Sequence, residues 1–159
     1  MSLSCRFVTF RLDDRQYALP LPVVERAIRA VEVTPLPNAP PVVLGVINVH
    51  GQVIPVLNVR RRFQLPERAI EPSDWFLLAR TARRRAVLVV DASDGVLERA
   101  SHDVVRSAGI LPGLEQFPGV ITLDEGLVLI HDLERFLSLD ETRALDQALD
   151  DSSRASDGR

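Results

Sequence analysis

Short apolar segments separated by turn residues run along most of this chain. Each has about four to eight residues, the usual length of a strand, and β-branched residues dominate several of them. In chain order the segments are 6–12, 16–20, 44–49, 53–59, 75–80, 86–91, 119–123 and 127–131. Many short strands at close spacing, with no long helical period between them, favour an all-β fold of small barrels over a parallel α/β sheet.

The breaks between these segments are rich in glycine, proline and acidic residues. They fall at Asp13-Asp14, Pro35 to Pro41, Gly51, Asp94-Gly95, Pro112-Gly113 and Asp124-Glu125-Gly126. Proline is poorly tolerated inside helices and central strands, so the 11 prolines also favour short strands. Residues 64–74 form the most polar break near the middle. We interpret them as the connection between two barrel halves, 1–63 and 75–137, of one domain that spans 1–149.

Two segments carry the spacing of a helix. In Leu21 to Ala30 the apolar residues can share one helical face, although a strand over its second half is equally allowed. Further on, Ser138 and Glu141 form a capping box, and leucines follow at spacings of three and four, which predicts a helix over 138–149. Residues 150–159 have no apolar side chain large enough to anchor them, so we expect a disordered tail.

The sequence around Gly51 predicts a β-hairpin. A two-residue loop, either His50-Gly51 or Gly51-Gln52, places odd positions of the first strand beside even positions of the second. One face then points to the core and is formed by Ile47, Val49, Ile54 and Val56. The outer face of the hairpin is formed by Val46, Asn48, His50, Val53, Pro55, Leu57 and Val59. This outer face is too apolar to be fully solvated, so either the rest of the chain or a partner must cover it.

Composition and charge exclude several classes of protein. The formal net charge of −3 argues against a dedicated nucleic-acid binder, which normally carries a basic excess. The arginine runs Arg60–Arg62 and Arg83–Arg85 follow or join strands and are predicted to be solvated turns that can contact acidic partner surfaces. The single cysteine, Cys5, allows no internal disulfide, and no apolar run approaches the roughly 18 to 20 residues of a membrane helix. We therefore expect a cytoplasmic protein.

The sequence offers no pattern from which a catalytic or metal site can be assembled. His50, His102 and His131 lie far apart and outside any H-x-x-x-H or H-E-x-x-H pattern, so no metal site is expected. The G-x-S-x-G, P-loop and G-x-G-x-x-G motifs do not occur, and we interpret Cys5 as a small core residue rather than a nucleophile. The sequence predicts a binding module without enzyme activity and without a cofactor.

Three blocks of the sequence resemble one known family. They read RFVTFRLDDRQYALPLPVVERAI, EVTPLPNAPPVVLGVINVHGQVIPVLNVRRRF and DEGLVLIHDLERFL, and the similarity to the CheW family of bacterial chemotaxis coupling proteins extends from about Arg6 to Leu137. The resemblance implies two SH3-like five-stranded β barrels packed together, a cytoplasmic location and no enzyme activity. It also implies a scaffold role, in which a monomeric protein links a chemoreceptor (a methyl-accepting chemotaxis protein) to a CheA-type histidine kinase.

Matching the chain to the family position by position assigns contacts to both partners. The groove between the barrels, where the receptor tip is expected to dock, involves Leu21, Arg26, Ala27, His50 and Trp75. Trp75 is either an aromatic anchor in this groove or a residue that fills the core. The regulatory domain of the kinase is expected at Gly45, where a bulky side chain would block close approach of the backbone.

Two departures from the family pattern bear on the partner. The usual N-L-R-G hairpin reads Asn48-Val49-His50-Gly51 here, and the usual V-x-E-I block reads Val24-Glu25-Arg26-Ala27. In the family the two replaced residues form an ion pair across the groove, so this groove is expected to be more positive and its receptor more acidic. The alternative is a CheW-like regulatory protein of a non-motility chemosensory pathway that has lost or altered receptor coupling.

Overall fold

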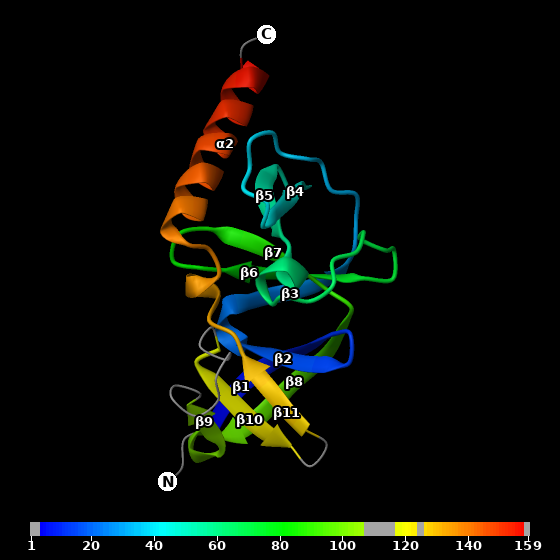
Figure 1. Ribbon diagram of the computed structural model, residues 1–159, viewed down its shortest axis with the longest axis vertical. Helices are drawn as coiled ribbons and strands as arrows, with labels where there is room; N and C mark the ends of the chain where they lie inside the picture. The colour runs from blue at the N-terminus through cyan, green and yellow to red at the C-terminus, as the bar shows by residue number, and fades with distance from the viewer. Residues whose placement is uncertain (1–3, 107–116, 124–125, 158–159) are drawn as a thin grey trace.

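Every apolar segment identified in the sequence forms most of a strand. The computed structural model describes residues 4–106, 117–123 and 126–157. In these residues the chain forms a six-stranded sheet, a five-stranded sheet and a long C-terminal helix (Figure 1). The predicted all-β class is confirmed, with one strand more in one sheet than the resemblance implied. Hydrogen bonds between the described strands join each sheet in a row rather than a closed ring.

The six-stranded sheet takes its strands from both ends of the chain. In spatial order they are β8 (Ala92–Ala100), β1 (Ser4–Leu12), β2 (Arg15–Pro20), β11 (Gly126–Ile130), β10 (Gly119–Leu123) and β9 (Val104–Arg106). The β2–β11 pair is parallel and the other pairs are antiparallel. A short 3-10 turn, η2 (Ser101–Asp103), connects β8 to β9.

The five-stranded sheet is formed by the middle of the chain. In spatial order its strands are β3 (Val24–Arg29), β6 (Trp75–Arg80), β7 (Arg85–Val90), β5 (Gln52–Leu57) and β4 (Val43–Val49). The predicted halves 1–63 and 75–137 therefore do not correspond to the two sheets, because 64–74 connects two parts of the same sheet. A polar segment marks a loop at the surface, whether or not a subdomain ends there.

Two local expectations from the sequence need correction. The segment from Leu21 to Ala30 is not a helix; a 3-10 turn, η1 (Leu21–Val23), leads directly into β3, so the strand that the sequence equally allowed is the alternative seen. The Asp94-Gly95 pair is not a turn but a bulge in β8, where Thr9 pairs with Gly95 and the next residue of β1 pairs with Ser93. Asp94 is the extra residue, and its carboxylate pairs with Arg11 at 3.1 Å. Pro112-Gly113 and Asp124-Glu125 lie outside the described residues.

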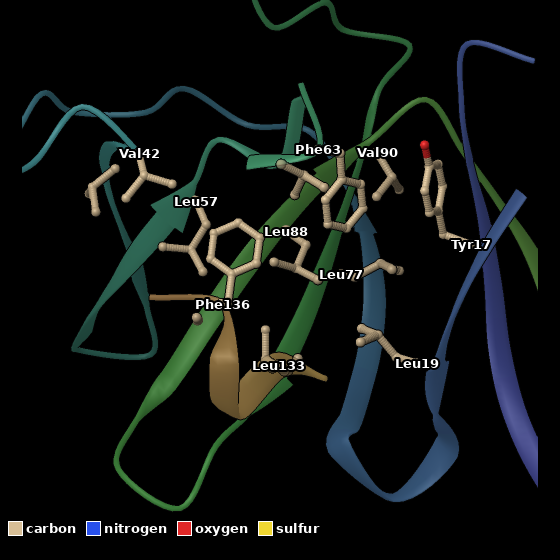
Figure 2. Packing of buried hydrophobic residues seen from close by; sticks show 14 of the residues in the cluster. Tyr17, Leu19, Val42, Leu57, Phe63, Leu77, Leu88, Val90, Leu133 and Phe136 are labelled. Atoms are coloured by element: carbon tan, nitrogen blue, oxygen red, sulfur yellow. The ribbon is translucent and has the colours of Figure 1, made fainter. Parts of the chain in front are cut away.

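The largest hydrophobic cluster lies between the sheets (Figure 2). Tyr17 of the six-stranded sheet and Leu77 and Leu88 of the five-stranded sheet are at most 1% exposed. Phe63, which follows the five-stranded sheet's β5, packs against the six-stranded sheet. The centre of its ring lies 4.8 Å from that of Tyr17 and 5.0 Å from that of Phe117. Complete burial of each such side chain contributes about 1.5–3 kcal/mol. Two smaller clusters each lie within one sheet, as expected for two packed units.

The C-terminal helix, α2 (Leu139–Asp157), is longer than the sequence predicted. Its capping box is confirmed: the Ser138 N–H donates to Glu141 Oε1 at 2.9 Å, and the Glu141 N–H donates to Ser138 Oγ at 3.1 Å. The helix does not end at residue 149, and the predicted disordered tail 150–159 is helical through Asp157. Lack of an anchoring apolar residue predicts exposure rather than disorder, because once a helix is nucleated each further residue adds a backbone hydrogen bond.

Arg60 connects segments from both sheets. It lies in a single helical turn, α1 (Val59–Arg62), and its Nη2 contacts the carboxylates of Asp13 at 2.9 Å and Asp91 at 2.8 Å. Asp13 belongs to the β1–β2 turn, whereas Asp91 lies between β7 and β8. The expectation of a fully solvated arginine run is therefore wrong for Arg60, whose side chain is only 9% exposed. The helical turn aims this side chain inward at two carboxylates.

A second arginine extends this charged network into the loop 64–74. The guanidinium of Arg68 donates to both carboxylate oxygens of Asp74, at 2.8 and 2.7 Å, and to Asp91 at 2.7 Å. The Glu71 N–H also donates to Asp74, at 2.8 Å. Burial by itself raises the pKa of Asp74, but the bonds from Arg68 and Glu71 outweigh it and hold that pKa below its usual value. Asp74 is thus a buried, fully bonded carboxylate.

Candidate partner-binding surface

Four of the five predicted receptor-groove residues lie on or beside β3 and β6. Arg26 and Ala27 are exposed on β3, and Leu21 is half-buried in η1. Trp75 begins β6 opposite Arg29, whose guanidinium lies 4.4 Å from the centre of the indole ring. One part of Trp75 packs on the main core cluster while the residue stays only half-buried. Both interpretations of Trp75, core residue and surface aromatic, therefore describe part of its surroundings.

His50, the fifth predicted groove residue, forms the tip of the β4–β5 hairpin. Val49 pairs with Gln52, so the two loop residues are His50 and Gly51, one of the two predicted alternatives. Their φ angles of 50° and 85° are both positive, as a primed hairpin turn requires. The Gly51 N–H donates to Asn48 Oδ1 at 2.9 Å and fixes the turn. The imidazole is thus carried on an exposed and well-defined tip.

His50 and Trp75 lie at opposite ends of the five-stranded sheet. The far end of β6 pairs Arg80 with Arg85, and Arg85 Nη1 donates to Gln52 Oε1 at 2.6 Å, beside the hairpin tip. Trp75 begins the same strand five residues earlier, about 17 Å away at the usual rise per residue. In the part of the chain that the structure describes, no hydrogen bond or ion pair links Arg26 to His50.

An ion pair that the sequence did not reveal lies close to the hairpin tip. Arg85 donates to both oxygens of the Glu25 carboxylate, at 3.1 and 2.5 Å, and Arg80 contacts the same carboxylate at 3.1 Å. Glu25 lies at a register shift in β3, which places it within reach of both arginines. Hydrogen bonding from Arg85 lowers the pKa of Glu25. With two arginines around one acid and Arg26 exposed nearby, this end of the sheet keeps a positive excess.

Gly45, the predicted kinase-contact residue, is buried against its own chain. Thr34 forms a bridge with Val46, with N–H···O distances of 2.9 and 2.8 Å. A Cβ atom at Gly45 would lie 2.3 Å from the Thr34 carbonyl oxygen and 2.7 Å from a methyl group of Val33. The close backbone approach expected at Gly45 therefore occurs within the molecule.

An apolar groove opens beside Gly45 and was not identified from the sequence. Its volume is about 480 Å³, and Val31 and Leu44 on its walls are 51% and 36% exposed. The other lining residues are Ala30, Glu32, Val33, Arg68, Ala69, Ile70, Glu71 and Pro72. The groove joins the segment before β4 to the loop 64–74, which are far apart in sequence, so no local pattern indicates it. Exposed apolar side chains on a concave surface are typical of a protein contact.

The outer face of the β4–β5 hairpin is covered mostly by the chain itself. Pro55 and Leu57 are buried, and they line a cavity of about 200 Å³ with Phe136 and Leu145. Phe136 follows the 3-10 turn η3 (Leu133–Arg135), and Leu145 belongs to α2. Figure 2 shows Phe136 between Leu57 and Leu88. Of the two predicted covers, the rest of the chain is the one seen, and Val53 near the tip stays 58% exposed.

Comparison with known families decides what kind of protein carries these surfaces. A family model of the CheW-like domain matches residues 6–147, a range that includes both sheets and the first half of α2. The chain belongs to the CheW-like domain family.

Individual CheW relatives match over most of their length. The chemotaxis protein CheW of Treponema pallidum (strain Nichols) is 25% identical over 146 residues, covering 88% of this chain and 86% of that protein. CheW of Rhizobium meliloti (strain 1021) is 26% identical over 141 residues, covering 86% and 90%. The crystal structure of the scaffolding protein TtCheW from Thermoanaerobacter tengcongensis matches with a TM-score of 0.79 and 22% identity, covering 87% of this chain and 96% of that one.

These matches confirm the CheW resemblance found in the sequence. They support the predicted class, a non-enzymatic coupling protein in chemotaxis signalling, and the similarity to TtCheW confirms the fold. No helix among the described residues is both long and apolar enough to cross a membrane. No group of three or more His, Cys, Asp or Glu side chains in the described ranges is placed to hold a metal ion.

Proposed function

We propose that this chain couples the cytoplasmic tip of a chemoreceptor to a CheA-type histidine kinase, acting in the cytoplasm as a monomer when free. The observation that carries the proposal is the CheW-like domain match over residues 6–147. The receptor tip contacts the surface of Leu21, Arg26, Ala27, His50 and Trp75. The regulatory domain of the kinase contacts the surface beside Gly45.

The receptor side of the proposal draws on exposure and charge. Arg26 and His50 are exposed. Close to them, the two positive charges of Arg80 and Arg85 share the single negative charge of Glu25. Such a surface favours a receptor tip with acidic side chains, because complementary charge sets both the association rate and the choice of partner.

Arg26→Glu is expected to weaken binding of the cytoplasmic tip fragment of a cognate chemoreceptor by about tenfold, a change of about 1.4 kcal/mol. Arg6→Glu makes the same charge change on β1 of the other sheet and should leave the affinity unchanged. Isothermal titration at two salt concentrations measures both variants. Equal affinities for Arg26→Glu and wild type would remove Arg26 from the receptor surface.

Val31→Glu is expected to lower affinity for the kinase regulatory domain at least tenfold, because it puts a charge into the apolar groove beside Gly45. Val31 is 51% exposed, so the fold should tolerate the change. Leu127→Glu is the control, since Leu127 is similarly exposed, at 47%, on β11. Titration of both variants with the kinase domain and with the receptor fragment separates the two contacts. Unchanged kinase affinity in Val31→Glu would contradict this site.

A further inference from the structure

The C-terminal helix α2 rests on the outer face of the hairpin through a narrow contact. Leu145 and Ala148 are 0% and 1% exposed and belong to the main core cluster. Leu149 is half-buried and shares a surface pocket with Val53 and Gln52 near the hairpin tip. Other side chains on the helix, such as those of residues 150–153, are exposed. Among the described side chains of α2, the fully buried ones at 145 and 148 therefore form one stripe.

The space beneath this stripe is incompletely filled. A cavity of about 200 Å³ lies between α2 and β5, with Leu57, Phe136 and Leu145 on its apolar wall. This pocket is partly open to solvent, so α2 does not close-pack over all of the apolar wall in the way that a protein interior does. The loose packing lowers the free-energy cost of moving α2 away or replacing it.

Arginines flank the stripe and meet carboxylates of α2. Arg62 pairs with Glu141, Arg84 pairs with Asp146, and Arg83 lies 3.9 Å from Asp146. The side chain of Arg84 is only 19% exposed, and its burial, together with the neighbouring charge of Arg83, lowers its pKa. A guanidinium in this position is stabilised by an acid on whatever helix lies above it.

We propose that this site, the helix seat, is exchangeable: α2 occupies it in the free protein, and an acidic amphipathic helix of the chemoreceptor tip replaces α2. The helix seat consists of Pro55, Leu57, Ala86 and Phe136, with Arg84 at its edge. Its present occupant shows the required chemistry, which is apolar residues at the spacing of 145, 148 and 149 and a carboxylate at 146. The seat is continuous with the hairpin tip through Gln52 and Val53. The inference rests on the proposed receptor coupling.

Hydrogen exchange of the full-length protein, with and without a saturating receptor tip fragment, tests the exchange directly. Amides of 142–153 should lose protection when the fragment binds, while amides of β5 and β7 keep theirs. Full protection of α2 at saturation overturns the inference and leaves receptor coupling intact. A protein whose affinity for the fragment is undetectable in all forms overturns the proposed function, and the inference with it.

Two variants give a second measurement on the full chain. Asp146→Asn removes the acid at Arg84 and should tighten fragment binding about fivefold, because less of the protein keeps α2 seated. Asp150→Asn makes the same charge change at an exposed position of α2 and should leave the affinity at the wild-type value. Equal tightening in both variants would reveal a general charge effect and contradict the helix seat.

A charge exchange distinguishes the two occupants. Arg84→Asp combined with Asp146→Arg keeps an ion pair between seat and helix, so α2 should retain its wild-type hydrogen-exchange protection. An acidic receptor helix should then meet a repelling carboxylate, and its affinity should fall at least tenfold. Unchanged affinity in this double variant shows that the receptor does not use the seat.

Discussion

Replacing Gly45 with alanine should lower the free energy of unfolding by about 3 kcal/mol. The added Cβ would lie 2.3 Å from the carbonyl oxygen of Thr34, which is a backbone atom and cannot rotate away. Either the bridge between Thr34 and Val46 must open or β4 must shift in its sheet. Urea denaturation followed by circular dichroism measures the loss.

Gly51→Ala is the matched control for this prediction. Gly51 lies in the same hairpin and has nothing within 4 Å of an added Cβ, but its φ is +85°. Alanine there should cost only the backbone strain of a left-handed residue, about 1 kcal/mol. If both variants lose the same stability, contact with Thr34 is not what requires glycine at position 45. If Gly45→Ala is fully stable and yet fails to bind the kinase domain, the position acts at the partner surface.

Asp74→Asn should also cost about 3 kcal/mol, because it removes one member of a buried ion pair and leaves Arg68 with a single carboxylate partner. The side chain of Asp74 is 2% exposed, so water has little access to this site and cannot solvate the Arg68 guanidinium there in place of the lost carboxylate. Asp150→Asn, an exposed change of the same kind on α2, should be neutral. A loss below 0.5 kcal/mol in Asp74→Asn would show that the network contributes little to stability.

The pH dependence gives this prediction a second readout. Because the pKa of Asp74 is lower in the folded than in the unfolded protein, its stabilising effect is fully present above about pH 4, near the unfolded value. The effect disappears as the pH falls through the folded value. The difference in stability between wild type and Asp74→Asn should therefore narrow in acid. A difference that stays constant from pH 7 to pH 3 would contradict the assignment to this carboxylate.

Apolar periodicity located the buried strands because their residues cannot be solvated, whatever lies around them. It missed β8, in which Val96 is 62% exposed and Asp94 and Gly95 form a bulge. An edge strand buries little, so its sequence carries a weak signal. The end of α2 was missed for a related reason, since residues 150–153 are helical and yet exposed.

The candidate sites depend on contacts between distant segments, which no local pattern encodes. Glu25 reaches Arg85 because β3 shifts register, and the groove beside Gly45 is formed where the loop 64–74 meets Leu44 and the segment before β4. The family resemblance supplied candidate positions, and the structure places Arg26 and His50 on separate elements, with Glu25 as the acid between the nearby arginines. Position-by-position matching predicts where a residue lies in the fold. The side chains that it contacts depend on the local register of the strands.

The nested strand order has a consequence for synthesis on the ribosome. All strands of the five-stranded sheet lie within residues 24–90, so that sheet can form as soon as β7 has emerged. In contrast, β2 must wait for β11, which ends at Ile130. Until then one edge of β2 is unpaired, and such an edge can recruit another nascent chain. A truncation before β11 is therefore expected to cause aggregation through a strand at the opposite end of the sequence.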